Sequence, residues 1–178
     1  MDAGRTMQCS TSMGKAVPRV ACATASLMLL ASLVVAQEPR RNAFDDPFTM
    51  VTQGFAGCPI AEGPLLTEEQ VRAEAHDRAQ RGTSCWLAGR CRLHNAYLYD
   101  KEIIPRVVKA VKADGRYGDT SVWALGQRRW VWLKGCVARP EQREALEGLV
   151  RNIDDVEGVV NELMVGATAA PPYKTVVP

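Results

Sequence analysis

The pattern of apolar and polar positions is most regular in the last third of the chain. Apolar residues recur at helical spacing from about Lys101 to Ala113, and Asp114-Gly115 is typical of a helix end. Two stretches rich in β-branched and aromatic residues follow, from Ser121 to Leu125 and from Trp130 to Val137, with polar residues between them. This pattern predicts a helix followed by a β-hairpin.

A second helix and a last strand complete this region. Pro140 suits the first turn of a helix, and the apolar stripe after it extends to about Ile153. Asp154-Asp155 then turns the chain into an apolar stretch from Val159 to Val165. The predicted order is helix, strand, strand, helix, strand, so we expect an α+β domain over residues 101–166.

The segments before this domain are less regular. Residues 37–66 contain several prolines and glycines and no sustained periodicity, which predicts an irregular arm. Thr67 and Gln70 form a capping-box pattern, and a helix is expected from about Glu68 to Arg81, ending at Gly82. Its apolar face is thin, so we expect it to lie on the surface.

Two segments lack a regular pattern. The rest of residues 67–100 comprises a cysteine-containing loop and an aromatic stretch over 95–99, which we expect to be extended against the domain. Residues 167–178 begin with alanines and prolines and are expected to form a disordered tail.

Two of the predicted strands carry a recognisable motif. The matching positions are Val131-x-Leu133-x-Gly135-x-Val137 and Ile153-x-x-Val156-x-x-Val159-x-Asn161-x-Leu163-x-Val165. This arrangement resembles the BON domain, a small module of bacterial envelope proteins, in a single copy. The resemblance implies a non-enzymatic module that attaches to phospholipid or to another envelope component. It also makes Gly135 and Asn161 motif residues.

The motif has one characteristic glycine and two departures from the family pattern. We expect Gly135 to let its strand and the following helix approach each other. Arg129 stands where many members have a hairpin glycine, and Asp155 stands where the family usually has glycine. Aspartate tolerates a left-handed backbone better than most residues, so the second departure is compatible with the fold.

Residues 1–36 have the pattern of a cleavable secretory signal. Lys15 and Arg19 precede an apolar run from Val20 to Val35, and we place the cleavage site after about Ala36. The run is shorter than the roughly 20 apolar residues that span a bilayer, which disfavours a retained membrane anchor. The mature protein is therefore expected to be periplasmic or secreted.

Four cysteines remain after the signal: Cys58, Cys85, Cys91 and Cys136. An oxidising compartment makes two disulfides the expected state, and three pairings are possible. The loop from Cys85 to Cys91 can close locally through its glycine, which would leave Cys58 to pair with Cys136. A metal site built from Cys85, Cys91 and His94 is disfavoured, because its thiolates would have to survive unoxidised.

Composition and charge exclude several classes of protein. Apolar residues make up 47% of the chain and charged residues 24%, which is a globular composition. The signal carries three basic residues and one acidic residue, so the mature chain is neutral, with 19 of each sign. A neutral chain argues against a nucleic-acid partner. Because no catalytic, cofactor or metal motif occurs, we expect neither an enzyme nor a cofactor.

The predicted hairpin exposes a row of aromatic residues. Strand alternation places Trp130 and Trp132 on one face, and Trp123 lies on the neighbouring strand. Helices on the opposite face would leave this Trp face uncovered. Either the arm and the first helix cover it, with Cys136 tied to the arm, or it is a surface for a protein partner.

A second candidate surface is basic. Residues 101–139 contain nine basic and three acidic residues, and Arg106, Lys109 and Lys112 recur every third position on one helix. This row could contact anionic lipid headgroups, or it could be a solvated face paired with the acidic half of the domain. The first hypothesis is an exported binding module that contacts phospholipid or an envelope protein. The alternative is a structural module that assembles through its Trp face.

Overall fold

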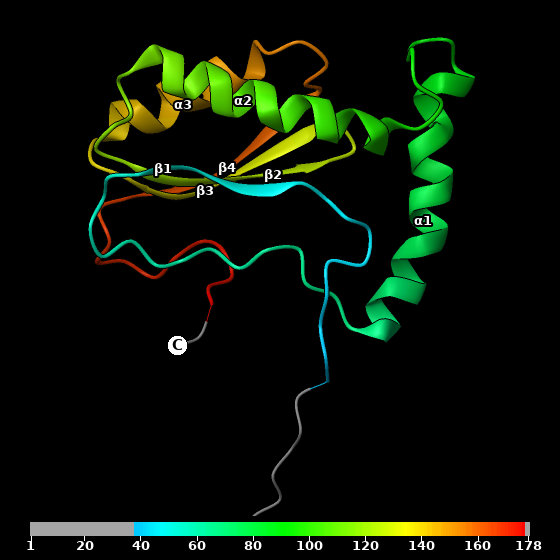
Figure 1. Ribbon diagram of the computed structural model, residues 1–178, viewed down its shortest axis with the longest axis horizontal. Coiled ribbons are helices and arrows are strands. Elements are labelled where there is room, and N and C mark those ends of the chain that lie inside the picture. The colour runs from blue at the N-terminus through cyan, green and yellow to red at the C-terminus, as the bar shows by residue number, and fades with distance from the viewer. Residues whose placement is uncertain (1–37, 177–178) are drawn as a thin grey trace, which may run out of the picture. The chain divides into compact units, whose positions relative to one another are not determined.

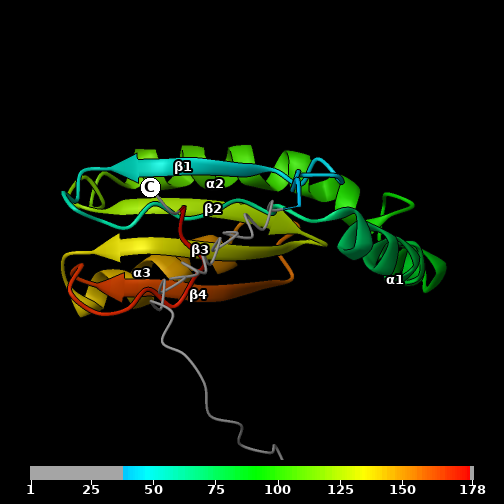
Figure 2. The same ribbon diagram turned by 90° about the horizontal axis from the view of Figure 1, so that it is seen from below.

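A four-stranded mixed sheet organises residues 38–176, the part of the chain that the computed structural model describes (Figure 1). The predicted signal, residues 1–36, lies outside the described residues. The strands are β1 (Phe48–Gln53), β2 (Ser121–Gln127), β3 (Trp130–Val137) and β4 (Gly158–Val165). They lie side by side in the order β1-β2-β3-β4 (Figure 2). The first two pairings are antiparallel, and β3 pairs with β4 in parallel.

Two helices cover one face of this sheet. They are α2 (Asp100–Asp114) and α3 (Pro140–Arg151), and Figures 1 and 2 show both on the same side of the strands. Between them and the sheet lies the main core, whose members include Ile103, Leu133, Leu146 and Leu163. The α+β class and the order helix, strand, strand, helix, strand are confirmed.

The arm is not irregular throughout, because it contains β1. This strand pairs with β2 over residues 48–53, with a register shift between Met50 and Thr52. Val51 is buried in the main core. Six residues between Pro47 and Gly54, with an interrupted alternation, are too short a signal for a strand that forms only against distant β2.

The described part of the C-terminal tail is ordered, contrary to the prediction from its prolines. The Tyr173 hydroxyl donates to the carbonyl oxygen of Pro59 at 2.9 Å, and the Glu62 N–H donates to the carbonyl oxygen of Lys174 at 2.8 Å. Figure 1 shows this segment and the chain after β1 together, on the sheet face opposite to α2 and α3. The arm provides the backbone partners that order the tail.

Helix α1 (Glu68–Leu87) is longer than expected. Its N-terminal capping box between Thr67 and Gln70 is present, but the helix continues through Gly82. A Cβ atom at Gly82 would lie 2.5 Å from the side chain of Asn95, so this glycine permits close packing rather than ending the helix. No helix within residues 38–176 is long and apolar enough to cross a membrane.

The aromatic stretch before α2 is helical rather than extended. It forms the 3-10 helix η1 (Ala96–Tyr99), which begins where the Asn95 side chain accepts the N–H of Tyr97 at 3.0 Å. A side-chain cap of this kind favours a turn over an extended strand.

A buried carboxylate fixes the hairpin between β2 and β3. Arg128 and Arg129 form its two-residue turn with φ angles of 55° and 68°. The Asp100 carboxylate accepts both backbone N–H groups of this turn, at 2.7 and 2.8 Å. Its side chain is 1% exposed, and burial raises the pKa of Asp100 to about 7, although the two N–H groups act in the opposite direction. The first residue of α2 therefore holds the turn of the hairpin.

Both disulfides favoured by the cysteine spacing are present. Cys58–Cys136 joins the arm to β3 across 78 residues of sequence, and Cys85–Cys91 closes a loop at the end of α1 with a separation of 6 residues. The first bond ties the arm to the domain, and the second constrains a single local loop.

We expect the two disulfides to differ in their contribution to stability. Because a disulfide restricts the unfolded chain more when its loop is longer, Cys58→Ala with Cys136→Ala should lower the free energy of unfolding by about 4 kcal/mol. Cys85→Ala with Cys91→Ala should lower it by about 2 kcal/mol. Urea unfolding of both double variants measures the difference. Equal losses, or a larger loss at the short loop, would contradict this ranking.

The Asp100 carboxyl predicts a specific pH dependence. An aspartate in an unfolded chain loses its proton near pH 4, whereas the native group keeps its proton to about pH 7. Between these values the unfolded state binds fewer protons, so this group lowers the free energy of unfolding as pH rises, by roughly 4 kcal/mol in total. The stability difference between wild type and Asp100→Asn should therefore shrink from about pH 4 to about pH 7 and then stay constant. Urea unfolding across this range tests it, and a constant difference would refute the raised pKa.

Candidate binding surfaces

The Trp face divides into a covered part and an open part. On β2, Trp123 is only 7% exposed, because Ala61 and Tyr173 pack over it with Phe48 and Cys58 beside them. Trp123 is therefore not available to a partner, contrary to one of the two expectations. The arm covers it as the other expectation states, together with the C-terminal segment.

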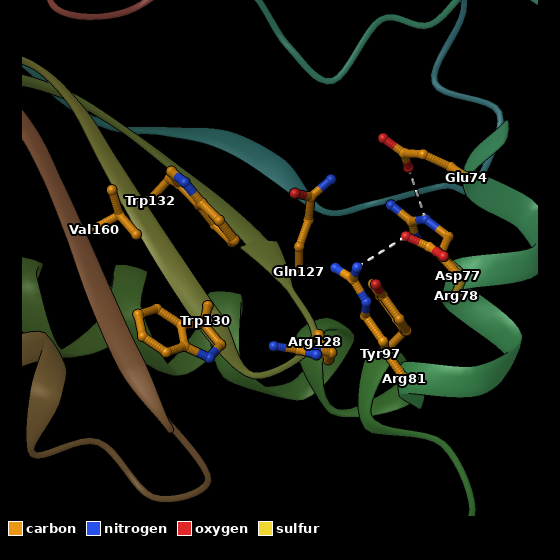
Figure 3. Close-up of a pocket in the computed structure, with 10 residues that line it drawn as sticks. All are labelled: Glu74, Asp77, Arg78, Arg81, Tyr97, Gln127, Arg128, Trp130, Trp132 and Val160. Atoms are coloured by element: carbon orange, nitrogen blue, oxygen red, sulfur yellow. Dashed lines mark hydrogen bonds and ion pairs between the residues drawn. The ribbon is translucent and has the colours of Figure 1, made fainter. Parts of the chain in front are cut away.

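The open part of the face lies along β3. Val131 and Leu133 are fully buried toward the helices, whereas Trp130 and Trp132 are half-buried on the other side. These two indoles line a hollow of about 450 Å³. Figure 3 shows its lining residues: Glu74, Asp77, Arg78, Arg81, Tyr97, Gln127, Arg128, Trp130, Trp132 and Val160. One wall is therefore α1, and the other is the sheet.

Arg78 fixes the wall formed by α1. Its guanidinium lies between two aromatic rings, 4.0 Å from the centroid of Phe44 and 4.4 Å from that of Tyr97. It also donates two hydrogen bonds to the carboxylate of Asp46 and one to Glu74 at 3.1 Å. Burial lowers the pKa of Arg78, but the bonds and the charge of Asp46 outweigh it and hold the pKa above its ordinary value. A paired, stacked arginine thus docks α1 against the arm and η1.

The charges around the hollow are mostly compensated. Glu74 is bound to Arg78, and Asp77 pairs with Arg81 at 3.0 Å. Arg128 has no carboxylate within 4.0 Å among residues 38–176, and the indole N–H of Trp130 has no acceptor in that part of the chain. The hollow can therefore accept an apolar or aromatic group, with one guanidinium at its rim for a polar or anionic group.

The predicted basic face is smaller than its sequence suggests. Arg106 donates to Asp155 at 3.1 Å, to Glu102 at 2.8 Å and to the carbonyl oxygen of Asp154 at 2.8 Å. These bonds connect α2 to the turn before β4. Arg106 is therefore engaged within the protein, which corrects its assignment to a face open to lipid.

Lys109 and Lys112 remain on that face. Both are exposed on α2, and neither has a carboxylate within 4.0 Å among the described residues. Lys109 also borders a shallow hollow with Ala110, Ala113 and Ile153, where the ends of α2 and α3 are close. Both lysines are thus charged groups without an ion-pair partner among residues 38–176, and Lys109 also lies beside apolar side chains.

The two motif residues have structural roles. At Gly135, φ is 130° and a Cβ atom would lie 2.0 Å from the carbonyl oxygen of Ser121. The glycine therefore lets β3 approach β2, whereas the sequence suggested an approach to the following helix. The Asn161 side chain donates at 3.0 Å to both the carbonyl oxygen of Arg143 and the carboxylate of Glu147, so it joins β4 to α3.

Asp155 and Arg129 occupy left-handed positions where the family pattern has glycine. The φ angle is 72° at Asp155 and 68° at Arg129. The Arg129 side chain lies 5.2 Å from the Tyr99 ring centroid and donates to the carbonyl oxygen of Asp155 at 2.8 Å. These contacts help to offset the cost of a left-handed conformation outside glycine.

Comparison with known proteins identifies one part of the chain. Residues 99–167 match the family model of the BON domain, in a single copy. The match begins just before α2 and ends just after β4, so β1, α1 and the C-terminal segment are additions to that domain. BON domains are generally non-catalytic modules that bind phospholipids or envelope components. A search of curated proteins found no match.

Arg78 provides a test of how the hollow is built. Arg78→Met would leave the buried Asp46 carboxylate without its cation, so the free energy of unfolding should fall by about 3 kcal/mol. Amide hydrogen exchange in α1 should also accelerate. Arg72→Met is the matched control, because Arg72 is exposed on the same helix and has no ion pair among the described residues. Similar losses in both variants would show that Arg78 does not dock the helix.

Proposed function

We propose, from the BON domain at residues 99–167, that this protein is an exported, non-catalytic binding module of the bacterial cell envelope. Two disulfides fit an oxidising compartment, and the pattern of residues 1–36 supports export. The arm and the C-terminal segment enlarge a small domain and bury part of its sheet, which a domain of this size needs for stability.

We assign the contact with the envelope to phospholipid at the exposed face of α2. The observation that carries this assignment is the uncompensated charge of two exposed lysines, Lys109 and Lys112, of which Lys109 lines the shallow hollow with Ala110 and Ile153. Anionic headgroups would neutralise the lysines, and the alkyl stems of the lysines would lie along the apolar residues. Since Arg106 is paired with Asp155 and Glu102, it joins α2 to the turn before β4 and is not part of the proposed lipid contact.

The pairing of the carboxylates supports a binding role rather than a catalytic one. Glu74 and Asp77, the carboxylates of the large hollow, are both neutralised by arginines. A general base needs a carboxylate oxygen that is free to accept a substrate proton, whereas each of these carboxylates contacts an arginine.

A second candidate function uses the large hollow. Trp130 and Trp132 are half-buried at its wall, and indoles in this situation are common anchors of protein interfaces. In this alternative, the chain is a structural module that receives an apolar side chain of an envelope protein. Raised salt would weaken the lipid contact but would leave this apolar contact in place.

The lipid contact predicts the behaviour of a double variant. The mature protein should co-sediment with vesicles that contain anionic phospholipid more than with neutral vesicles. Lys109→Gln with Lys112→Gln should weaken this binding by roughly 30-fold, because each basic residue near an anionic surface contributes about 1 kcal/mol. Both side chains are exposed, so the fold should be retained.

The control removes the same charge elsewhere. Arg72→Gln with Lys174→Gln changes two exposed basic residues outside α2, and its binding should stay close to that of wild type. Equal binding by wild type and the Lys109 and Lys112 double variant would refute the contact at α2. Absence of binding by wild type would favour the alternative at the large hollow.

A further inference from the structure

The end of α1 carries an apolar tip outside the BON domain. Trp86 and Leu87 are the last two residues of this helix, and they are 48% and 73% exposed. They are adjacent in sequence and point out of a protein whose other large apolar side chains are mostly buried. We infer that this Trp86–Leu87 tip inserts into the interface of an anionic bilayer, an inference that rests on the proposed lipid contact.

A disulfide and backbone hydrogen bonds constrain the loop that carries the tip, so Trp86 and Leu87 stay exposed. The Cys85–Cys91 disulfide closes the loop, and inside it the N–H of Gly89 donates to the carbonyl oxygen of Trp86 at 2.9 Å. The N–H of Arg90 donates to the carbonyl oxygen of Cys85 at 2.9 Å. A loop fixed in this way presents its two apolar side chains with a smaller ordering cost for the backbone on binding.

Contacts beyond the disulfide attach the tip to the BON domain. Cys91 and Leu93 pack against the main core, and the Leu93 N–H donates to the Tyr99 hydroxyl at 2.9 Å. Arg92 forms an ion pair with Glu102 of α2. These contacts connect the tip to the helix that carries the two lysines, and Figure 1 shows the end of α1 on the same side of the sheet as α2.

The charge around the tip suits an anionic lipid surface. Residues 81–99 contain three arginines and no acidic residue. Two of these arginines are paired, Arg81 with Asp77 and Arg92 with Glu102, while Arg90 is exposed and has no carboxylate within 4.0 Å among residues 38–176. Tryptophan and leucine beside an arginine are typical of the boundary between headgroups and acyl chains, where an indole has one apolar and one polar side.

Vesicle binding of three variants tests the tip. The variants are Trp86→Ser with Leu87→Ser at the tip, Lys109→Gln with Lys112→Gln on α2, and the control Ile60→Ser, which removes an apolar side chain that is 58% exposed on the arm. Vesicles of phosphatidylglycerol and phosphatidylcholine are used at low and raised salt. The tip variant should bind at least about tenfold more weakly at both salt concentrations, because buried apolar groups contribute most of its loss. The Ile60→Ser control should bind like wild type.

Fluorescence quenching gives an independent measurement of depth. Brominated acyl chains should quench tryptophan emission of the wild type on binding, and Trp86→Phe, which keeps an aromatic side chain, should still bind but lose this quenching. If the tip variant binds like wild type and quenching is the same in Trp86→Phe, the tip inference is wrong. In that case the vesicle binding of the Lys109→Gln, Lys112→Gln variant still tests the lipid contact at α2. If only the tip variant loses binding, the inference stands and the α2 contact fails.

Discussion

The buried carboxylate of Asp100 is the contact on which both candidate surfaces depend. It begins α2, and it holds the turn between β2 and β3 through two backbone N–H groups. The turn then places Arg129 over Tyr99 and against the carbonyl oxygen of Asp155, which leads into β4. One carboxylate thus sets the lysines of α2 relative to the strand that carries Trp130 and Trp132. Burial of the Asp100 carboxylate away from water costs stability, and the two hydrogen bonds that it accepts offset part of that cost.

Local periodicity predicted the elements whose burial depends on their own neighbourhood. Helices α2 and α3 and strands β2 to β4 each carry enough alternating or helical apolar positions to be recognised alone. Strand β1 and the C-terminal segment could not be predicted in this way. Val51 is buried where β1 pairs with β2, and Tyr173 is buried where it packs with Trp123 and Ala61 and donates to Pro59. Their order comes from partners that are distant in sequence.

The candidate site was only partly visible in the sequence, for the same reason. Strand alternation placed three tryptophans on one face, but the segments that separate Trp123 from Trp130 and Trp132 come from both ends of the described chain. Helical spacing likewise grouped Arg106 with Lys109 and Lys112, although Asp155, 49 residues further along, engages the arginine. The run of residues 81–99, with three arginines and no acidic residue, predicted nothing by itself, because its meaning depends on the exposure of Trp86 and Leu87.

The proposed contacts with lipid would attach the protein by two weak interactions rather than one strong one. Two lysines would supply a modest, salt-sensitive attraction, and a single indole with a leucine would supply a modest, salt-resistant one. Stable anchoring to a bilayer generally takes two such signals, and here the Cys85–Cys91 disulfide and the ion pair between Arg92 and Glu102 connect the two surfaces. When the first contact forms, the second becomes an intramolecular event with a high effective concentration. In this proposal, the additions to the BON domain would give a small module a second contact with the bilayer, and the hollow beside Trp130 and Trp132 would stay open.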